Sequence, residues 1–218
     1  MAIAFDAASG GATTAASSLT FAHTCTGSDL ILFVGAFNGT NNVTGVTYNG
    51  VAMTLVDTAV AQAGVNYKLF YLINPATGAN NVVISTDVAS NVLRGVSTSY
   101  TGSAQSGQPD SFSKVQGAQT YPLAISTTVV AANCWLVMAG GNVDDGQNAG
   151  TNTTSRVAVN SMEMFDSNAT VGTGAQVLNA TSTVSPTNSG FVIVSLAPAG
   201  GAAGTARDAR LLTLLGVG

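Results

Sequence analysis

Charged residues are scarce in this sequence, and their scarcity excludes several kinds of chemistry. Only 7% of the chain is charged, against about 25% in an average soluble domain. Glu163 is the only glutamate, His23 the only histidine, and Lys68 and Lys114 are the only lysines. Because acid–base catalysis relies on such side chains, we expect no enzyme. Little charge repulsion would keep copies of the chain apart, so we expect an assembly component.

Basic residues are too few and too scattered for a nucleic-acid partner, which needs clustered Lys and Arg. Six basic residues stand against ten acids, and the net charge is −4. No apolar run is long enough to span a bilayer as a helix, and the first residues lack the pattern of a secretory signal. We therefore expect no membrane partner and synthesis in the cytoplasm without export. Cys25 and Cys134 are too few for a disulfide framework, so we predict two buried thiols.

Short β-prone segments separated by turn residues make up most of the chain. Leu30–Phe37 and Cys134–Met138 are continuous apolar runs, which are typical of central strands covered on both faces. Within Val43–Val56, Asn49-Gly50 favours a type I′ hairpin turn. Further strands are predicted at Ser18–Thr24, Asn66–Ile73, Asn81–Thr86, Leu93–Tyr100, Pro122–Val129, Arg156–Val159, Met162–Phe165, Ala175–Thr183 and Phe191–Leu196. This pattern predicts an all-β protein, an antiparallel, jelly-roll-like β-sandwich over residues 1–199.

A faint internal repeat accompanies this pattern. Leu19–Gly35 can be placed over Leu123–Ala139 without a gap, at an offset of 104 residues. The alignment superimposes Leu32 on Leu136 and gives both segments a strand, a polar corner and a buried strand. Two β segments of biased composition can also match by chance. We take the repeat as support for two similar halves within one sandwich.

The sequence changes character after residue 199. Residues 200–218 begin with a Gly- and Ala-rich linker. The segment from Thr205 to Asp208 resembles a capping box and precedes four leucines. We predict a short C-terminal helix whose leucines dock on a partner, with packing on its own domain as the alternative. The predicted docking residues are Leu211, Leu212, Leu214 and Leu215.

Motifs for nucleotide binding and nucleophilic catalysis are absent from the sequence. It contains neither the phosphate-binding loop nor the spaced-glycine dinucleotide pattern, and no Gly-x-Ser-x-Gly elbow. His23 lies in a predicted strand beside an apolar run, so we interpret it as a structural or solvent-facing histidine. We predict no catalytic residue, no cofactor and no metal.

Two ion sites remain as alternatives. His23 and Cys25 share one face of a strand, but zinc needs more ligands than these two. Asp144–Asn148 offers oxygen ligands in a Gly-containing loop, although its spacing departs from that of an EF-hand. A turn rich in Asp and Asn explains that loop without an ion.

Sugar chemistry would need paired carboxylates or exposed aromatic rings. Asp110, Asp144 and Asp166 could serve a glycosidase, but nothing in their spacing couples them. Among the aromatics, Tyr48 at the predicted hairpin tip is best placed to stack on a sugar. Trp135 lies inside an apolar strand, so we assign it to the core.

Four stretches carry a family resemblance that covers about the first hundred residues. Gly27–Val34, Val43–Leu55, Lys68–Pro75 and Val82–Thr86 resemble a β-sandwich module that recurs in tailed-bacteriophage structural proteins. The resemblance implies a non-enzymatic virion protein, either a decoration or cement protein on the capsid or a piece of tail or fibre. Because the matching positions are turns and core strands, it carries over no catalytic residue.

Our leading hypothesis is a capsid decoration protein that forms homo-oligomers and binds the major capsid protein or other virion proteins, and is therefore located in the virion. The alternative is a tail or head fibre or adhesin domain that binds host surface glycans. A glycan-cleaving enzyme ranks last.

Overall fold

The computed structural model describes residues 1–39, 42–90, 92–144 and 147–200, and these residues form an all-β structure without a helix. The strands of the first half (residues 4–101) are β1 Ala4–Thr13, β2 Ala16–Cys25, β3 Ile31–Asn38, β4 Val43–Tyr48, β5 Val51–Ala52, β6 Thr54–Gln62, β7 Val65–Ile73, β8 Gly78–Ser90 and β9 Leu93–Thr101. Those of the second half (residues 111–196) are β10 Ser111–Gln119, β11 Leu123–Val129, β12 Trp135–Asn142, β13 Gln147–Ala149, β14 Thr154–Val159, β15 Met162–Asp166, β16 Gly174–Ser182 and β17 Thr187–Leu196.

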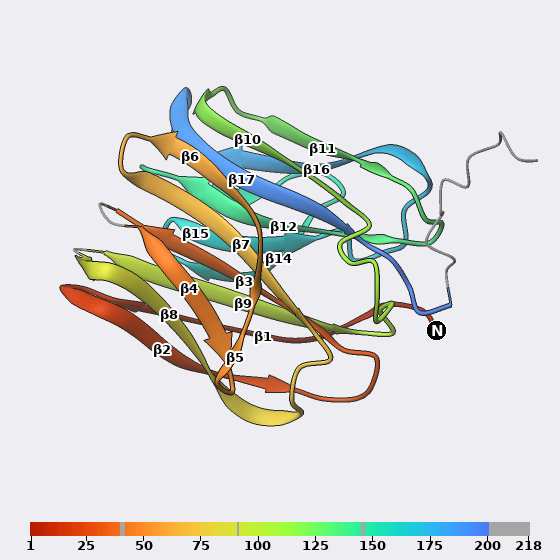
Figure 1. Cartoon of the computed structure of the whole chain (residues 1–218). Helices are drawn as coiled ribbons and strands as arrows, with labels where there is room; N and C mark the ends of the chain where they lie inside the picture. The colour runs from red at the N-terminus through yellow and green to blue at the C-terminus, as the bar shows by residue number, and fades with distance from the viewer. Residues whose placement is uncertain (40–41, 91, 145–146, 201–218) are drawn as a thin grey trace, which may run out of the picture.

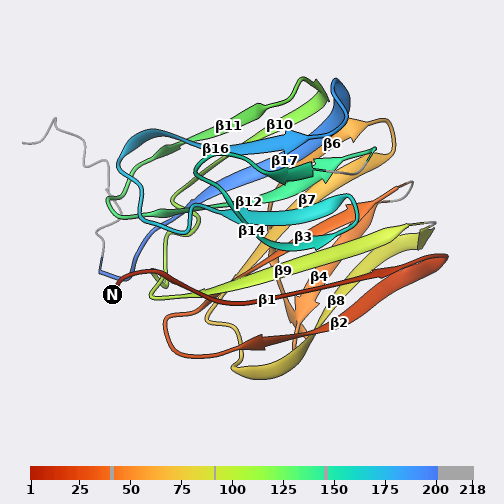
Figure 2. The ribbon, with the colours of Figure 1, turned by 180° about the vertical axis from the view of Figure 1, so that it is seen from behind.

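The strands form four antiparallel sheets that stack as layers (Figures 1 and 2). The first half makes an outer sheet of order β2-β8-β4-β5 and a central sheet of order β1-β9-β3-β7-β6. The second half makes a central sheet of order β10-β17-β12-β15-β14 and an outer sheet of order β11-β16-β13. The two central sheets therefore lie between the two outer ones.

Three apolar cores separate the four layers. The first half has its own core, with Leu32 and Val34 of β3 packed toward Val82 and Ile84 of β8. The second half has the equivalent core between its own two sheets. Between the central sheets lies a third core, which gathers Phe33 from the first half and Val137 from the second. The middle strands of the central sheets, β3 and β12, are thus buried on both faces.

The two halves have the same strand order, and the repeat seen in the sequence lies on equivalent strands. Ile31–Asn38 and Trp135–Asn142 are offset by 104 residues and form the middle strand of each central sheet. β3 contacts β15 while β12 contacts β7, and β1 contacts β14 while β10 contacts β6. Such reciprocal contacts are those of a two-fold symmetric interface, so the single chain is organised like a dimer of its halves.

Small irregularities repeat as well. A β-bulge follows Leu55 in β6, and another follows Ser155 at the equivalent place in β14. Asp6 accepts hydrogen bonds from Thr26 N at 3.0 Å and Ser99 Oγ at 2.6 Å. Asp110, 104 residues further on, accepts the equivalent bonds from Val130 N at 2.8 Å and Ser195 Oγ at 2.8 Å. The same carboxylate anchor therefore fixes the start of each half.

Several sequence predictions are confirmed. The all-β, antiparallel architecture is present, and the apolar runs form β3 and β12, every residue of which is buried. Asn49 and Gly50 have φ of 48° and 77° and close the hairpin of β4 and β5, as a type I′ turn requires. Cys25 and Cys134 are free, buried thiols.

Other predictions need correction. The halves do not share one two-sheet sandwich, because each has two sheets of its own. β1, β10 and β13 were not predicted; Ala, Gly and Ser dominate β1, and pairing with β9 overrides their weak β-propensity. The predicted second strand of the hairpin divides at Met53, where the chain passes from the outer to the central sheet. The predicted C-terminal helix lies outside the described residues.

Candidate functional site

His23 is the side chain best suited to acid–base chemistry, and it is buried between the two sheets of the first half. Its Nε2 lies 3.0 Å from Ser99 Oγ, and its Nδ1 lies 2.9 Å from Ser97 Oγ and 3.1 Å from Ser9 Oγ. Ser99 donates its hydroxyl proton to Asp6, so it can only accept from Nε2–H. In its neutral form the imidazole is therefore the Nε2–H tautomer. Burial lowers its pKa to about 4, although nearby Asp6 acts in the opposite direction.

This cluster contains Ser, His and Asp but not the geometry of a catalytic triad. In a triad the carboxylate orients the imidazole, which then takes the serine proton. Here the carboxylate of Asp6 binds Ser99, and Ser97 on the far side of the ring is fully buried. The hydrogen bonds join β1, β2 and β9, so His23 is the structural histidine that we expected rather than a solvent-facing one.

The two thiols are poorly suited to nucleophilic chemistry. Burial raises the pKa of both, that of Cys134 to about 12 with a further contribution from Asp110. Cys25 follows His23 on the same buried face of β2. Among the described residues no group of three or more His, Cys, Asp or Glu side chains could hold a metal ion.

The three carboxylates considered for glycosidase chemistry each have separate partners. Asp110 accepts backbone N–H groups of Val130 and Ala131. Asp144 accepts the hydroxyl of Thr187, and the residues that follow it, 145–146, lie outside the described part. Asp166 belongs to a cluster between the halves, so the structure does not couple the three carboxylates.

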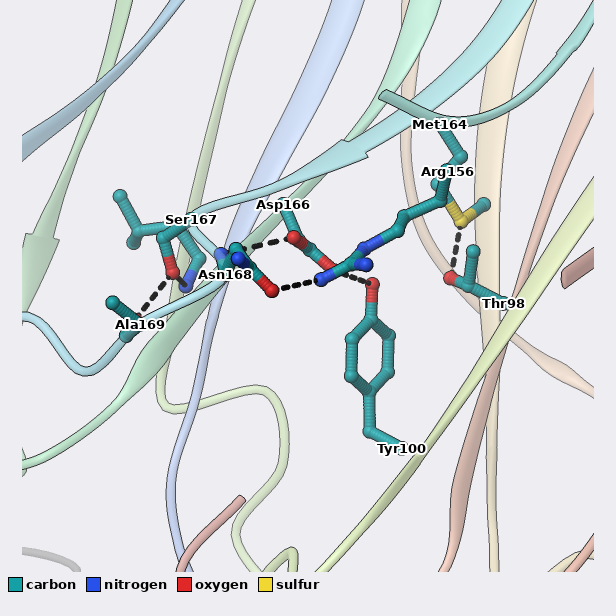
Figure 3. Close-up of polar contacts among 9 residues, drawn as sticks. Thr98, Tyr100, Arg156, Met164, Asp166, Ser167, Asn168 and Ala169 are labelled. Carbon is teal, nitrogen blue, oxygen red and sulfur yellow. Dashed lines mark hydrogen bonds and ion pairs between the residues drawn. The ribbon is translucent and has the colours of Figure 1, made fainter. Parts of the chain in front are cut away.

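That cluster is centred on Asp166 at the end of β15 (Figure 3). Arg156 of β14 donates from Nε to Asp166 Oδ2 at 2.6 Å, and Tyr100 OH of β9 donates to the same oxygen at 3.0 Å. The Arg156 guanidinium also lies 4.2 Å above the Phe5 ring. Burial, together with the charge of the neighbouring Asp166, raises the pKa of Tyr100 far above its usual value. The cluster joins β14 and β15 of the second half to β1 and β9 of the first.

Sequence reasoning did not find this cluster, because Tyr100 is far from Arg156 and Asp166 in the chain. Arg156 and Asp166 could have been flagged as an oppositely charged pair flanking a predicted hairpin. Nothing local indicates that Tyr100 of the other half would complete it.

The two outer sheets present regular surfaces made almost entirely of neutral residues; the one Asp, Glu, Lys or Arg residue in their described strands is Asp87, which is exposed near the end of β8. Exposed or half-buried residues alternate there with core residues. In the first outer sheet they are Ser18, Thr20, Ala22, Thr24, Thr47, Ala79, Asn81, Val83 and Ser85. In the second they are Ala124, Ser126, Thr128, Asn148, Ala175, Val177, Asn179 and Thr181. We call these sets the first and second outer faces; they lie on opposite sides of the molecule (Figure 1).

The internal repeat relates the two outer faces. Thr20, Ala22 and Thr24 of β2 are offset by 104 residues from Ala124, Ser126 and Thr128 of β11. A hollow of about 410 Å³ beside the β4–β5 turn opens on the first face. Small neutral side chains lose little conformational entropy when they are buried. Such faces suit close packing against another protein more than capture of a charged ligand.

Three further predictions concern residues that do not belong to these faces. Tyr48 is fully buried, and its hydroxyl donates to backbone carbonyls near the end of β2 and the start of β8. The prediction that it could stack on a sugar is therefore wrong, because the side chain turns into the core. Trp135 is in the core between the central sheets, as expected. The predicted docking residues Leu211, Leu212, Leu214 and Leu215 lie outside the described residues.

Comparison of the chain with protein-family models, curated proteins and solved structures finds no match. No helix in the described part is long and apolar enough to cross a membrane.

Proposed function

We propose that the chain is a non-enzymatic virion structural protein, specifically a capsid decoration protein that forms homo-oligomers and binds the major capsid or other virion proteins. The observation that carries this proposal is the pair of nearly uncharged outer faces on opposite sides of one molecule. A protein with two such faces can bridge two neighbours at once. Many modest contacts of this kind, repeated over a closed shell, sum to tight attachment.

The topology supports the same proposal. We interpret each half as a jelly-roll-like sandwich, since β1-β9-β3-β7 faces β2-β8-β4-β5. Jelly rolls are a frequent architecture of viral capsid domains, although fold alone never fixes function. The resemblance of the first hundred residues to phage structural modules points the same way. The leucines of residues 205–218 are proposed as an additional docking element.

The first test is the copy number of the chain in purified virus particles, measured by quantitative mass spectrometry against the major capsid protein. Hundreds of copies per particle would support a decoration protein. A handful would shift the assignment to the alternative, a tail or fibre component. Absence from particles would overturn the virion assignment.

The second arm of the test addresses the outer faces directly. Thr24→Glu and Thr128→Glu place a charge at equivalent points of the two outer faces. Thr14→Glu places the same charge in the exposed β1–β2 turn and serves as the control. We expect both face variants, but not the control, to lose incorporation into particles because a buried, unpaired carboxylate is costly. Equal incorporation of all three would show that the outer faces are not the contacts.

A further inference from the structure

A groove with a cavity volume of about 660 Å³ opens in the first half, between the β4–β5 hairpin and strands β6 and β7. Val46, Met53, Leu55 and Phe70 form an apolar wall. The polar residues Asn42, Thr44, Thr47 and Ser85 also line the groove. Ligand pockets generally have volumes of about 300–1,000 Å³ and pair apolar walls with a few placed polar groups. The groove has both properties, because the side chain of Lys68 also lines it.

Lys68 supplies a buried positive charge that lacks a countercharge. The residue is 8% exposed, and its Nζ donates to Asn42 Oδ1 at 2.6 Å and to Val43 O at 2.7 Å. These bonds use two of the three N–H groups of an ammonium. Within the described part of the chain, no carboxylate lies within ion-pair distance of it.

The positive charge of Lys68 is therefore only partly neutralised by its surroundings. Burial lowers the pKa of Lys68, and the more distant Asp87 opposes this shift. Buried charges in proteins are normally paired. An anion that entered the groove would find an apolar wall and one remaining ammonium N–H.

The groove also has room at Gly45. A Cβ atom added there would meet no heavy atom within 4 Å, and its φ lies outside the left-handed region. A larger residue could therefore be placed at Gly45 without backbone strain. The backbone of β4 thus does not require glycine at this position, and the open space beside it belongs to the groove.

The second half does not reproduce this site. Lys68 pairs with Ala36 in β3, and the equivalent residue Glu163 pairs with Gly140 in β12. The second outer sheet also has no counterpart of β5. The groove and its cation thus break the internal repeat, as a binding site confined to one half would.

We propose that this groove binds a molecule that carries a carboxylate on an apolar chain. The carboxylate accepts a hydrogen bond from the Lys68 ammonium, and the chain lies against Met53, Leu55 and Phe70. The alternative is that water completes the third N–H and the groove holds no ligand. The proposal does not rest on a virion role, since it concerns one molecule and needs no assembly.

The test is isothermal titration calorimetry on the full chain with three probes: octanoate, octanol and acetate. We expect octanoate to bind more tightly than octanol or acetate, by about tenfold or more, since charge-assisted hydrogen bonds are worth about one to two such factors. Lys68→Met should reduce octanoate affinity to that of octanol. Gly45→Val should weaken both octanoate and octanol by filling the groove.

Gly172→Val is the matched control, because a Cβ there would meet only the end of the Gln176 side chain, at 3.8 Å. It should bind octanoate like the unmodified chain. Thermal melting of each variant shows whether it is folded; should Lys68→Met unfold, Gly45→Val still tests the site. Octanoate binding that is absent, or that survives both Lys68→Met and Gly45→Val, would overturn the proposal.

Discussion

The first and second halves of the chain use the same framework of strands but fill equivalent positions with different side chains. At one position the first half buries the cation of Lys68 and the second half buries the carboxylate of Glu163. At another, His23 of β2 corresponds to Thr127 of β11. Strand order, bulges and the Asp anchors are shared, so the framework tolerates a wide choice of buried polar groups. The two halves therefore differ in their buried polar side chains rather than in their framework of strands.

The two flanks of the central interface show the same contrast. On the flank of β1 and β14, Arg156 and Asp166 form an ion pair whose side chains are 15% and 0% exposed. The equivalent positions on the other flank are Val56 and Tyr71, which pack on the core between the central sheets. Apolar side chains can thus serve where the first flank uses a buried ion pair. Burial of an ion pair gives little net stability, but loss of one partner is costly.

The largest effect should come from breaking the buried ion pair. Arg156→Met leaves the carboxylate of Asp166 buried with Tyr100 OH and the backbone N–H of Asn168 as its remaining donors. We expect the free energy of unfolding to fall by about 3–5 kcal/mol, measured by urea unfolding at pH 7. The triple variant Arg156→Met, Asp166→Leu, Tyr100→Phe places uncharged side chains in the cluster, like Val56 and Tyr71 at the equivalent positions of the other flank, and should recover most of this loss. A cost below about 1 kcal/mol for Arg156→Met would show that Asp166 is solvated and that the flanks are equivalent.

The second comparison is between His23 and Thr127. His23 has a folded pKa of about 4, below its unfolded value of about 6.5. The unfolded state therefore binds the proton first, and stability that is complete above pH 6.5 is lost as the pH falls toward 4. From the size of the shift we expect a loss of about 3 kcal/mol over that range.

His23→Thr, which copies the second half, isolates this contribution. The variant has a smaller side chain and should be less stable at pH 7, but it lacks the titrating group. Its stability deficit relative to the unmodified chain should shrink by about 3 kcal/mol between pH 7 and pH 4, measured by denaturant titration at each pH. A constant deficit would mean that His23 is not buried in its neutral form.

Much of the framework could be predicted from the sequence, because strong local signals mark it. The apolar runs of β3 and β12 and the Asn49-Gly50 turn are visible without a structure. Extending the 104-residue repeat backward would also have matched Asp6 with Asp110. Within a single half, however, nothing local indicates that two central sheets would pack on each other.

The buried polar groups could not be placed in the same way. The sequence singles out Lys68 and His23 only by their rarity. The ammonium of Lys68 is held by a carbonyl at the start of β4, and His23 is held by Ser9, Ser97 and Ser99 from two other strands. Such environments depend on long-range pairing, which a single sequence does not reveal.

The smallest effect should come from the ion pair on the β6–β10 flank. Lys114 Nζ lies 3.0 Å from Asp57 Oδ1, and the two side chains are 36% and 27% exposed. Because Lys114 also donates to Thr58 O and Asp57 accepts from Thr58 N, single alanine variants would mix several losses, whereas a double-mutant cycle isolates the pair. We expect a coupling of about 0.2–1 kcal/mol that decreases in 1 M salt, where the Debye length is about 3 Å. A coupling above about 2 kcal/mol that persists in salt would place this pair in a desolvated environment like that of Arg156 and Asp166. The contrast between a buried ion pair on one flank and a solvated ion pair on the other would then be wrong. The two sides of the interface would differ only in which strands supply the charges.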